Sequence, residues 1–177
     1  MIEVYPEHPA EWLPYDIRFP VVASRAAALI RGDVPRVTIE HIGSTAVPGC
    51  GGKGVIDLMV VCDLEALEVV KGGLATLGFQ PQSTRDPFPE SRPMRVGALL
   101  HEGRLFRIHV HVLTSGAEEV ASLLAFRDRL RVDPKARSEY EMHKRSILAA
   151  GIVDPVAYCE AKSKFIQEGL RPGQGSA

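Results

Sequence analysis

The chain has 177 residues, of which 45% are hydrophobic and 24% charged, and its formal net charge at pH 7 is −1. These are ordinary values for a globular protein, and a nearly neutral chain lacks the global field that attracts nucleic acid or an anionic membrane. The N-terminal segment has no secretory pattern, no apolar run reaches membrane-spanning length, and three scattered cysteines give no disulfide framework. We therefore expect one cytoplasmic domain over 1–177, with no membrane partner and with a nucleic-acid partner unlikely.

The first half of the chain predicts a helix, two strands and a second helix. Helical spacing of apolar residues runs over 11–31, although Pro14 and Pro20 argue against one straight helix. Alternation of polar and apolar residues predicts a half-buried strand over 36–42, and a nearly continuous apolar run predicts a central strand over 55–61. Helical spacing returns over 64–77, followed by Gly78 as a C-terminal cap.

The second half predicts a loop, a hairpin and a helical end. The proline-rich segment 79–92 predicts a loop, with a short strand at its start as the alternative. Two strands over 94–100 and 104–113 follow, joined by a tight connection that ends in glycine. Beyond residue 118 the pattern is helical, with helices expected at 118–131, 134–150 and 155–169 and a flexible tail at 170–177. This order predicts the α+β class, a mixed β-sheet with helices packed on one face and a helical C-terminal third.

A glycine-rich segment separates the first two predicted strands. Residues 49–54 match G-x-G-x-x-G by letter, but a dinucleotide site needs a helix after the glycines, and here a strand follows. A Walker A loop is also excluded, because Lys53 precedes a glycine rather than Ser or Thr. What remains is the turn Gly43-Ser44-Thr45 directly after a strand. Its backbone N–H groups and hydroxyls predict an anion-binding site.

Asp57 interrupts the apolar run of the second predicted strand. A buried, unpaired carboxylate is costly, so Asp57 requires a basic partner, a cluster of donors or a metal ion. A phosphate-holding turn beside an acid on the next strand suits phosphoryl or nucleotidyl transfer, in which positioning and charge neutralisation supply most of the catalysis. We therefore predict a catalytic role for Asp57 and a phosphate contact for Lys53. The alternatives are a structural ion pair of Asp57 with Lys53 or an arginine, and a solvated Lys53 in the loop.

Arg107, His109 and His111 alternate along the last predicted strand, so their side chains share one face. Together with Asp57 they are expected to line a cleft against the C-terminal helices, with the Gly43–Thr45 turn at its rim. Three interpretations remain open. The three side chains contact phosphate, or the two imidazoles bind a metal ion together with Asp57, or the histidines are solvated on a partly exposed face of the sheet.

Four further motifs stand out: I-E-H-I-G-S-T-A-V-P-G at 39–49, K-x-x-I-D at 53–57, R-x-H-V-H-V at 107–112 and F-R-D-x-L-R at 126–131. Together they resemble the GrpB family, a group within the nucleotidyltransferase superfamily. The resemblance covers about residues 11–166 and implies a nucleotidyltransferase-like sheet in a family of poorly defined activity, with relatives fused to dephospho-coenzyme A kinases. The helical pairs Tyr140 with Lys144 and Tyr158 with Lys162 are interpreted as packing pairs, and the resemblance places some of these side chains in the pocket.

The chain departs from the superfamily at its acids. The superfamily pattern is similar to Gly-Ser, then two acids spaced D-x-D or D-x-E on the next strand, then a third acid on a later strand. Here Met59 stands at the second position, and the later strand offers His109 and His111. Mg²⁺ prefers several oxygen ligands, whereas imidazole suits zinc, manganese or iron. We expect a divalent metal, magnesium or manganese with zinc as the alternative.

These observations predict a protein that binds a nucleotide or another phosphorylated small molecule, with metal-dependent nucleotidyl transfer as the finer prediction. Two alternatives remain. One is a non-catalytic nucleotide-binding accessory or sensor domain, which the missing second acid favours. The other is a metal-dependent hydrolase that uses Asp57, His109 and His111.

Overall fold

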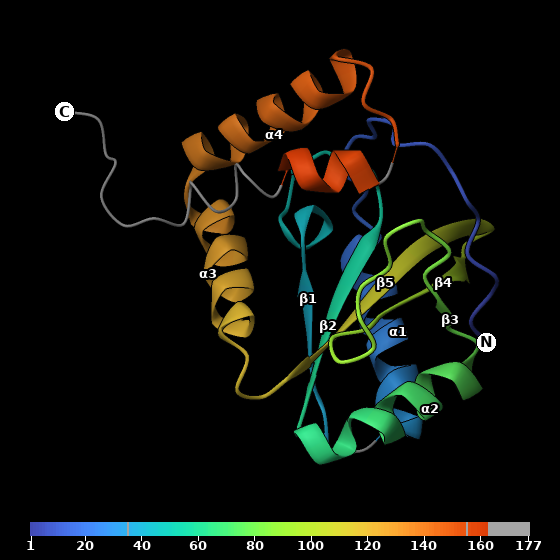
Figure 1. Ribbon diagram of the computed structural model, residues 1–177. Coiled ribbons are helices and arrows are strands. Elements are labelled where there is room, and N and C mark those ends of the chain that lie inside the picture. Colours follow the sequence, from blue (N-terminus) through green and yellow to red (C-terminus); the bar gives the residue numbers. More distant parts are fainter. Residues whose placement is uncertain (35, 155, 163–177) are drawn as a thin grey trace.

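The computed structural model describes residues 1–34, 36–154 and 156–162, which form a five-stranded mixed β-sheet with packed helices (Figure 1). The strands are β1 (Thr38–Ile42), β2 (Ile56–Cys62), β3 (Gln80–Pro81), β4 (Met94–His101) and β5 (Arg104–Thr114). The main helices are α1 (Phe19–Asp33), α2 (Leu67–Leu77), α3 (Glu118–Val132) and α4 (Pro134–Ala149), and single 3₁₀ turns lie at Ser44–Ala46 and Leu64–Ala66. The predicted α+β class is confirmed.

The strands are arranged in the order β1-β2-β5-β4-β3. Strands β2 and β5 are parallel, and the other neighbouring pairs are antiparallel. The β4–β5 hairpin turns at Glu102 and Gly103, which both have positive φ, so the predicted tight connection is confirmed. The parallel pairing places two strands that are distant in sequence side by side at the centre of the sheet.

One face of the sheet is packed against α1 and α2. Alternate residues of the central strands supply this core, among them Leu58 and Val60 of β2 and Ile108 and Val110 of β5, all at most 1% exposed. Because side chains alternate along a strand, the intervening residues face the other side. The predicted apolar face of β5 is therefore confirmed, and its polar residues face away from α1 and α2.

Helix α3 covers part of the second face at the β1 side of the sheet (Figure 1). Three of its apolar side chains pack against Ile42, Met59 and Leu113. Helix α4 joins α3 through a cluster that includes Phe126 and Tyr140, whose rings meet edge to face. These clusters leave the Asp57 end of β2 outside the apolar core of this face.

The predicted helix over 11–31 is wrong in its first part, because α1 begins at Phe19. Two prolines in this stretch explain the difference, since proline is tolerated only in the first turn of a helix. Residues before α1 instead lie along other elements, with Glu3 bridged to Ala98 and Leu13 bridged to Gly52. This N-terminal segment thus reaches both the sheet and the glycine-rich loop.

The C-terminal third is helical as predicted over the residues described. Asp133 caps α4, because its side chain accepts hydrogen bonds from the Lys135 and Ala136 N–H groups at 3.0 Å. A further helical stretch covers 156–162. The rest of the predicted helix at 155–169 and the predicted tail at 170–177 lie outside the described residues. No helix within those described ranges has the length and apolar character needed to cross a membrane.

Candidate functional site

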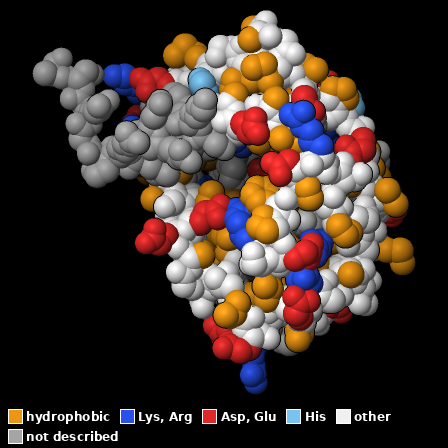
Figure 2. Space-filling model, viewed as in Figure 1, with side chains coloured by type: hydrophobic (Ala, Val, Ile, Leu, Met, Phe, Trp, Pro, Cys, Tyr) orange, Lys and Arg blue, Asp and Glu red, His pale blue; other side chains and the backbone are white. Residues whose placement is uncertain are grey.

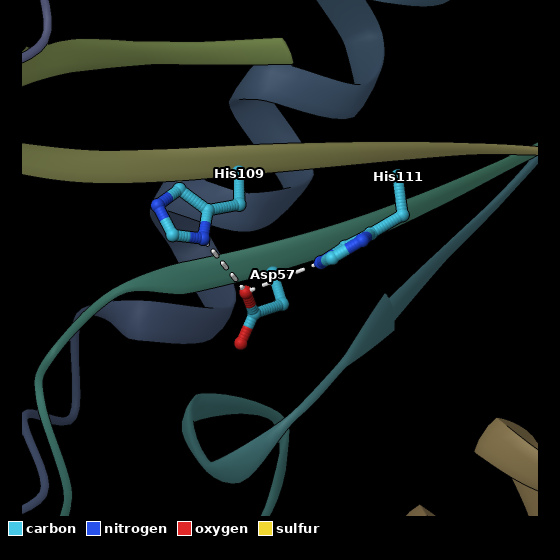
Figure 3. A group of neighbouring side chains, drawn as sticks. All are labelled: Asp57, His109 and His111. Carbon is cyan, nitrogen blue, oxygen red and sulfur yellow. Dashed lines mark ion pairs between the residues drawn. The ribbon is translucent and has the colours of Figure 1, made fainter. Parts of the chain in front are cut away.

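Asp57 of β2 and His109 and His111 of β5 project toward one another from the same face of the sheet (Figure 3). The Asp57 Oδ1 atom lies 3.5 Å from His109 Nδ1 and 3.7 Å from His111 Nε2. One potential ligand atom from each residue lies within 4.8 Å of the other two. The side chains are 22%, 18% and 16% exposed, so the group is largely covered but still reaches solvent.

The register of the central strands explains this convergence. In the parallel β2–β5 pair, Asp57 lies opposite His109, and Met59 lies opposite His111. Side chains directly opposite each other on neighbouring strands point the same way. The structure therefore brings together the three residues predicted to hold a metal ion.

Charge in this group is concentrated on Asp57. Burial alone would raise the pKa of Asp57, but His109 and His111 favour the ionised form and hold its pKa well below its usual range. Burial lowers the pKa of His109, although Asp57 opposes this effect. At neutral pH the group therefore contains an ionised carboxylate beside a His109 ring that is mainly neutral.

The Gly43 turn lies directly against Asp57. Gly43 has φ 71° and ψ −172°, a conformation that is essentially restricted to glycine. A Cβ at this position would lie 2.3 Å from Asp57 Oδ2. A Cβ at Gly52 would lie 2.8 Å from the Ser44 hydroxyl oxygen and 3.1 Å from Lys144 Nζ. The two glycines thus allow the turn, the acid and a lysine to approach closely.

Thr45 supports the turn from inside. It is 2% exposed, and its hydroxyl donates to the Val55 carbonyl at 3.2 Å and lies 3.0 Å from His41 Nε2. Burial lowers the pKa of His41 to about 4, so this imidazole is neutral at physiological pH. The Thr45 hydroxyl is thus used within the protein, and the phosphate contact expected for Thr45 stays a prediction.

Lysine side chains surround the glycine-rich loop. Lys144 is 1% exposed; its Nζ donates to the Gly51 carbonyl, lies 3.5 Å from Cys50 Sγ and lies 4.3 Å from the centre of the Tyr140 ring. Burial lowers the pKa of Lys144 to about 8. Burial also lowers the pKa of Lys53, whose Nζ lies 4.7 Å from the centre of the Tyr158 ring. Both ammonium groups thus rest on aromatic rings.

Arg107 and Lys162 complete the cationic group. Arg107 donates to the Lys53 carbonyl at 2.7 Å, which ties β5 to the loop. The pKa of Lys162 lies above its ordinary value, chiefly through Tyr140 and also through Asp57. Within residues 1–34, 36–154 and 156–162, no ion pair joins Lys53, Arg107, Lys144 or Lys162 to a carboxylate.

The structure adds two features to the site predicted from the sequence. The Tyr5 hydroxyl lies 3.0 Å from His109 Nε2, and burial raises the pKa of Tyr5 to about 12, so the phenol keeps its proton. No motif or periodicity marks Tyr5, which lies in the N-terminal segment. The second feature is Met59, which is fully buried against Ile42 and Leu113. The position of the expected second acid is therefore part of the apolar core.

Curated relatives cover most of this chain. A "UPF0157 protein" of Streptomyces coelicolor is 37% identical over 131 residues, which is 73% of this chain and 65% of that protein. A "UPF0157 protein" of Halalkalibacterium halodurans is 31% identical over 159 residues, which is 88% of this chain and 78% of that protein. A "Dephospho-CoA kinase" of Mycolicibacterium paratuberculosis is 26% identical and covers 92% of this chain. The chain spans just under two thirds of the Streptomyces protein and 46% of the kinase.

Solved structures identify the fold. The conserved protein GrpB from Enterococcus faecalis matches with a TM-score of 0.67 and 22% identity, over 90% of this chain and 97% of that chain. The Cid1 poly(U) polymerase with Mg 3′-dATP bound matches with a TM-score of 0.55 and 12% identity, over 90% of this chain and 49% of that chain. At these identities the likeness establishes a nucleotidyltransferase-like fold and no activity.

The motifs around Gly43, Asp57 and His109 lie close together in a fold of the kind that the sequence resemblance implied. A model of the family described as "GrpB protein" matches residues 9–171. The match includes the turn, both central strands and the described part of the C-terminal helices. The chain therefore belongs to the GrpB family.

Proposed function

We propose that the site binds a nucleotide or another small molecule that carries phosphate groups. The observation that carries the proposal is the imbalance of charge around the glycine-rich loop, where the cations of Lys53, Arg107, Lys144 and Lys162 outnumber two carboxylates. These carboxylates are Asp57 and Glu141, and Glu141 accepts a hydrogen bond from the Gly51 N–H at 2.6 Å. Cations held in a half-buried site without acidic partners among the described residues create a strong local preference for an anion. A ligand with several negative charges satisfies that preference best.

The donors around this loop suit phosphate. Lys144 is the most buried cation, and its ordinary pKa is restored when an anion is bound beside it. Arginine and lysine donors bind phosphate oxygens through charge-assisted hydrogen bonds. The Ser44 hydroxyl lies on the same side of Gly52 as Lys144 Nζ, so a neutral donor is available next to the cations.

The fold supports a nucleotide as the phosphorylated ligand. The Cid1 polymerase, which shares this fold, was solved with Mg 3′-dATP bound, and a relative of this chain is named as a dephospho-CoA kinase. Nucleotides and coenzyme A precursors are therefore the first candidates. Transfer through paired magnesium ions does not fit these residues, because Met59 is packed in the apolar core and the later strand contributes imidazoles. Met59 instead favours the accessory or sensor role.

A thermal-unfolding panel tests the proposal. Nucleoside mono-, di- and triphosphates, coenzyme A precursors and tripolyphosphate are each added to the purified chain, with and without Mg²⁺ or Mn²⁺. A compound at a hundred times its dissociation constant adds about 2.7 kcal/mol to the free energy of unfolding. Lys53→Met and Lys144→Met should weaken this response at least tenfold in ligand concentration. Lys135→Met, an exposed lysine at the start of α4, is the control and should respond like the wild type.

Two outcomes would contradict the proposal. In the first, no phosphorylated compound raises the unfolding temperature of the wild type. In the second, the Lys53 and Lys144 variants respond like the Lys135 variant, which would place the ligand elsewhere. Asp57→Asn separates binding from metal dependence, because its response without divalent ions should remain while any gain from Mn²⁺ is lost.

A further inference from the structure

The group formed by Asp57, His109 and His111 carries an inference that does not depend on a phosphorylated ligand. We propose that Asp57, His109 and His111 bind a single transition-metal ion, and that Tyr5 is a positioning residue that holds the His109 ring in the orientation required for this ion. The proposal replaces the pair of magnesium ions that the fold family implies with one ion of the zinc, cobalt or iron type.

The distances suit a metal ion. Ligand atoms bound at 2.0–2.1 Å with tetrahedral angles lie about 3.3 Å apart. The Asp57 Oδ1 atom is 3.5 Å from His109 Nδ1 and 3.7 Å from His111 Nε2. Small side-chain rotations would therefore bring these atoms to ligand distances without a change in the backbone. Figure 3 shows both rings directed at the same carboxylate oxygen. A tetrahedral ion held by the three residues would have its fourth ligand position open for water or a substrate oxygen.

The donor types select the metal. Two imidazoles and one carboxylate are the ligand set of catalytic zinc sites and of non-haem iron sites with open positions. Magnesium requires oxygen ligands in octahedral geometry and seldom binds imidazole. The three residues lie on two adjacent strands of a single sheet, so the backbone holds them in fixed positions. A rigid frame of this kind favours one defined coordination geometry.

The surrounding core limits the site to one ion. A second ion on the fold's usual pattern would need a carboxylate two residues after Asp57, on the same face of β2. That position is Met59, which is fully buried against Ile42 and Leu113. Apolar side chains therefore fill the space in which a second set of oxygen ligands would stand.

Tyr5 controls the orientation of His109. The Tyr5 hydroxyl lies 3.0 Å from His109 Nε2, while Nδ1 faces Asp57. When Nδ1 is a metal ligand, Nε2 carries the proton, and this N–H donates a hydrogen bond to the Tyr5 hydroxyl oxygen. Metal-bound histidines usually have such a hydrogen-bond partner on their second ring nitrogen. Tyr5 is itself fixed, because its N–H donates to the Gln80 side chain at 3.1 Å.

His111 is held differently. Its ring meets the Phe88 ring edge to face, with the ring centres 5.8 Å apart. Its Nδ1 is buried, and no residue within 1–34, 36–154 and 156–162 offers it a hydrogen bond. Of the two histidines, His109 is therefore the one whose ring is held by a hydrogen bond to a neighbouring side chain, which makes Tyr5 the residue to test.

Cobalt(II) provides the test, because its visible absorption reports coordination directly. The untagged chain is titrated with Co²⁺ and, in parallel, with Zn²⁺ in a calorimeter, without any phosphorylated compound. We expect one ion per chain, no displacement by millimolar Mg²⁺, and loss of binding in Asp57→Asn, His109→Gln and His111→Gln. The control His101→Ala, at a half-buried histidine at the end of β4, should bind like the wild type.

The Tyr5 part of the proposal has its own readout. Tyr5→Phe should weaken Co²⁺ affinity about 10- to 100-fold and shift the absorption bands of the saturated protein. Tyr15→Phe, in the same N-terminal segment, should change neither quantity. A purely structural Tyr5 would leave the bands of bound Co²⁺ unchanged.

The proposal is overturned if Co²⁺ and Zn²⁺ fail to bind, if two ions bind per chain, or if binding survives both histidine substitutions. The Tyr5 assignment is overturned if Tyr5→Phe matches Tyr15→Phe. Urea unfolding of each metal-free variant shows that the chain is folded before titration. Failure here leaves the phosphorylated-ligand proposal standing, since the unfolding panel also measures that binding in the absence of divalent ions.

Discussion

Replacing Gly43 with alanine tests how the turn and the acid are fitted together. The added Cβ would lie 2.3 Å from Asp57 Oδ2, whereas ordinary contacts begin near 3.4 Å. The carboxylate would have to move by about 1 Å, which exceeds the roughly 0.5 Å tolerance of a binding constellation. Gly43→Ala should therefore damage metal binding as well as stability.

Two contributions to the stability loss can be separated. The backbone conformation of Gly43 costs about 1–3 kcal/mol for a residue with a side chain. Overpacking against Asp57 adds about 1–3 kcal/mol. Gly49 is a matched control in the same loop, because it has φ +77° but nothing within 4 Å of an added Cβ. Gly49→Ala should cost only about 1–2 kcal/mol, the backbone part of the effect.

The assay combines urea unfolding with Co²⁺ titration. We expect Gly43→Ala to lose at least about 1 kcal/mol more than Gly49→Ala, and to lose at least tenfold in Co²⁺ affinity. Gly49→Ala should keep the wild-type affinity. In the Asp57→Ala background, the extra stability cost of Gly43→Ala should shrink, because the clashing oxygen is gone. Equal costs for the two glycine variants, with equal metal affinity, would refute the close fit between Gly43 and Asp57.

Four further predictions concern Lys144, Met59 and the cap of α4. Lys144→Met should leave the free energy of unfolding unchanged or raised, because an apolar side chain of similar length replaces a buried charge without a carboxylate partner among the described residues. Because the pKa of Lys144 is about 8, its positive charge is lost above that pH, so calorimetry should show wild-type phosphate affinity falling between pH 7 and 9 more than in Lys144→Met. Met59→Asp should cost about 3–5 kcal/mol in urea unfolding and create no magnesium site in a Mg²⁺ titration, since the new carboxylate is buried without a partner. Asp133→Ala should cost about 1 kcal/mol through loss of the α4 cap, with unchanged Co²⁺ binding as the check that the site is intact.

The alternation of side chains along the strands made much of the site predictable. It assigned Asp57 to one face of β2 and His109 and His111 to one face of β5. The glycine-rich segment also predicted a loop beside the site, because glycine has no Cβ and lets other groups approach the backbone closely. The sequence does not specify which strands are neighbours. The parallel pairing of β2 with β5 brings Asp57 next to His109 and His111 on one face of the sheet.

Other features depend on contacts that no local pattern encodes. Tyr5 lies in a segment without periodicity and reaches His109 only because the N-terminal residues lie along the sheet. Lys144 has the helical spacing of an ordinary surface lysine, but packing of α4 on the glycine-rich loop buries it. The wrong start of the first helix has a local cause, because its prolines outweighed the apolar spacing.

Strand β2 meets β5 only after the chain has passed through α2, β3 and β4. Contacts between such distant segments form slowly, because loop-closure entropy must be overcome before the pairing is rewarded. A chain still on its way to the native state therefore cannot bring the carboxylate of Asp57 to the imidazole of His109. If Co²⁺ is present during refolding, its visible absorption should therefore appear only when β2 and β5 have paired. This signal should lag behind the fluorescence change of early collapse.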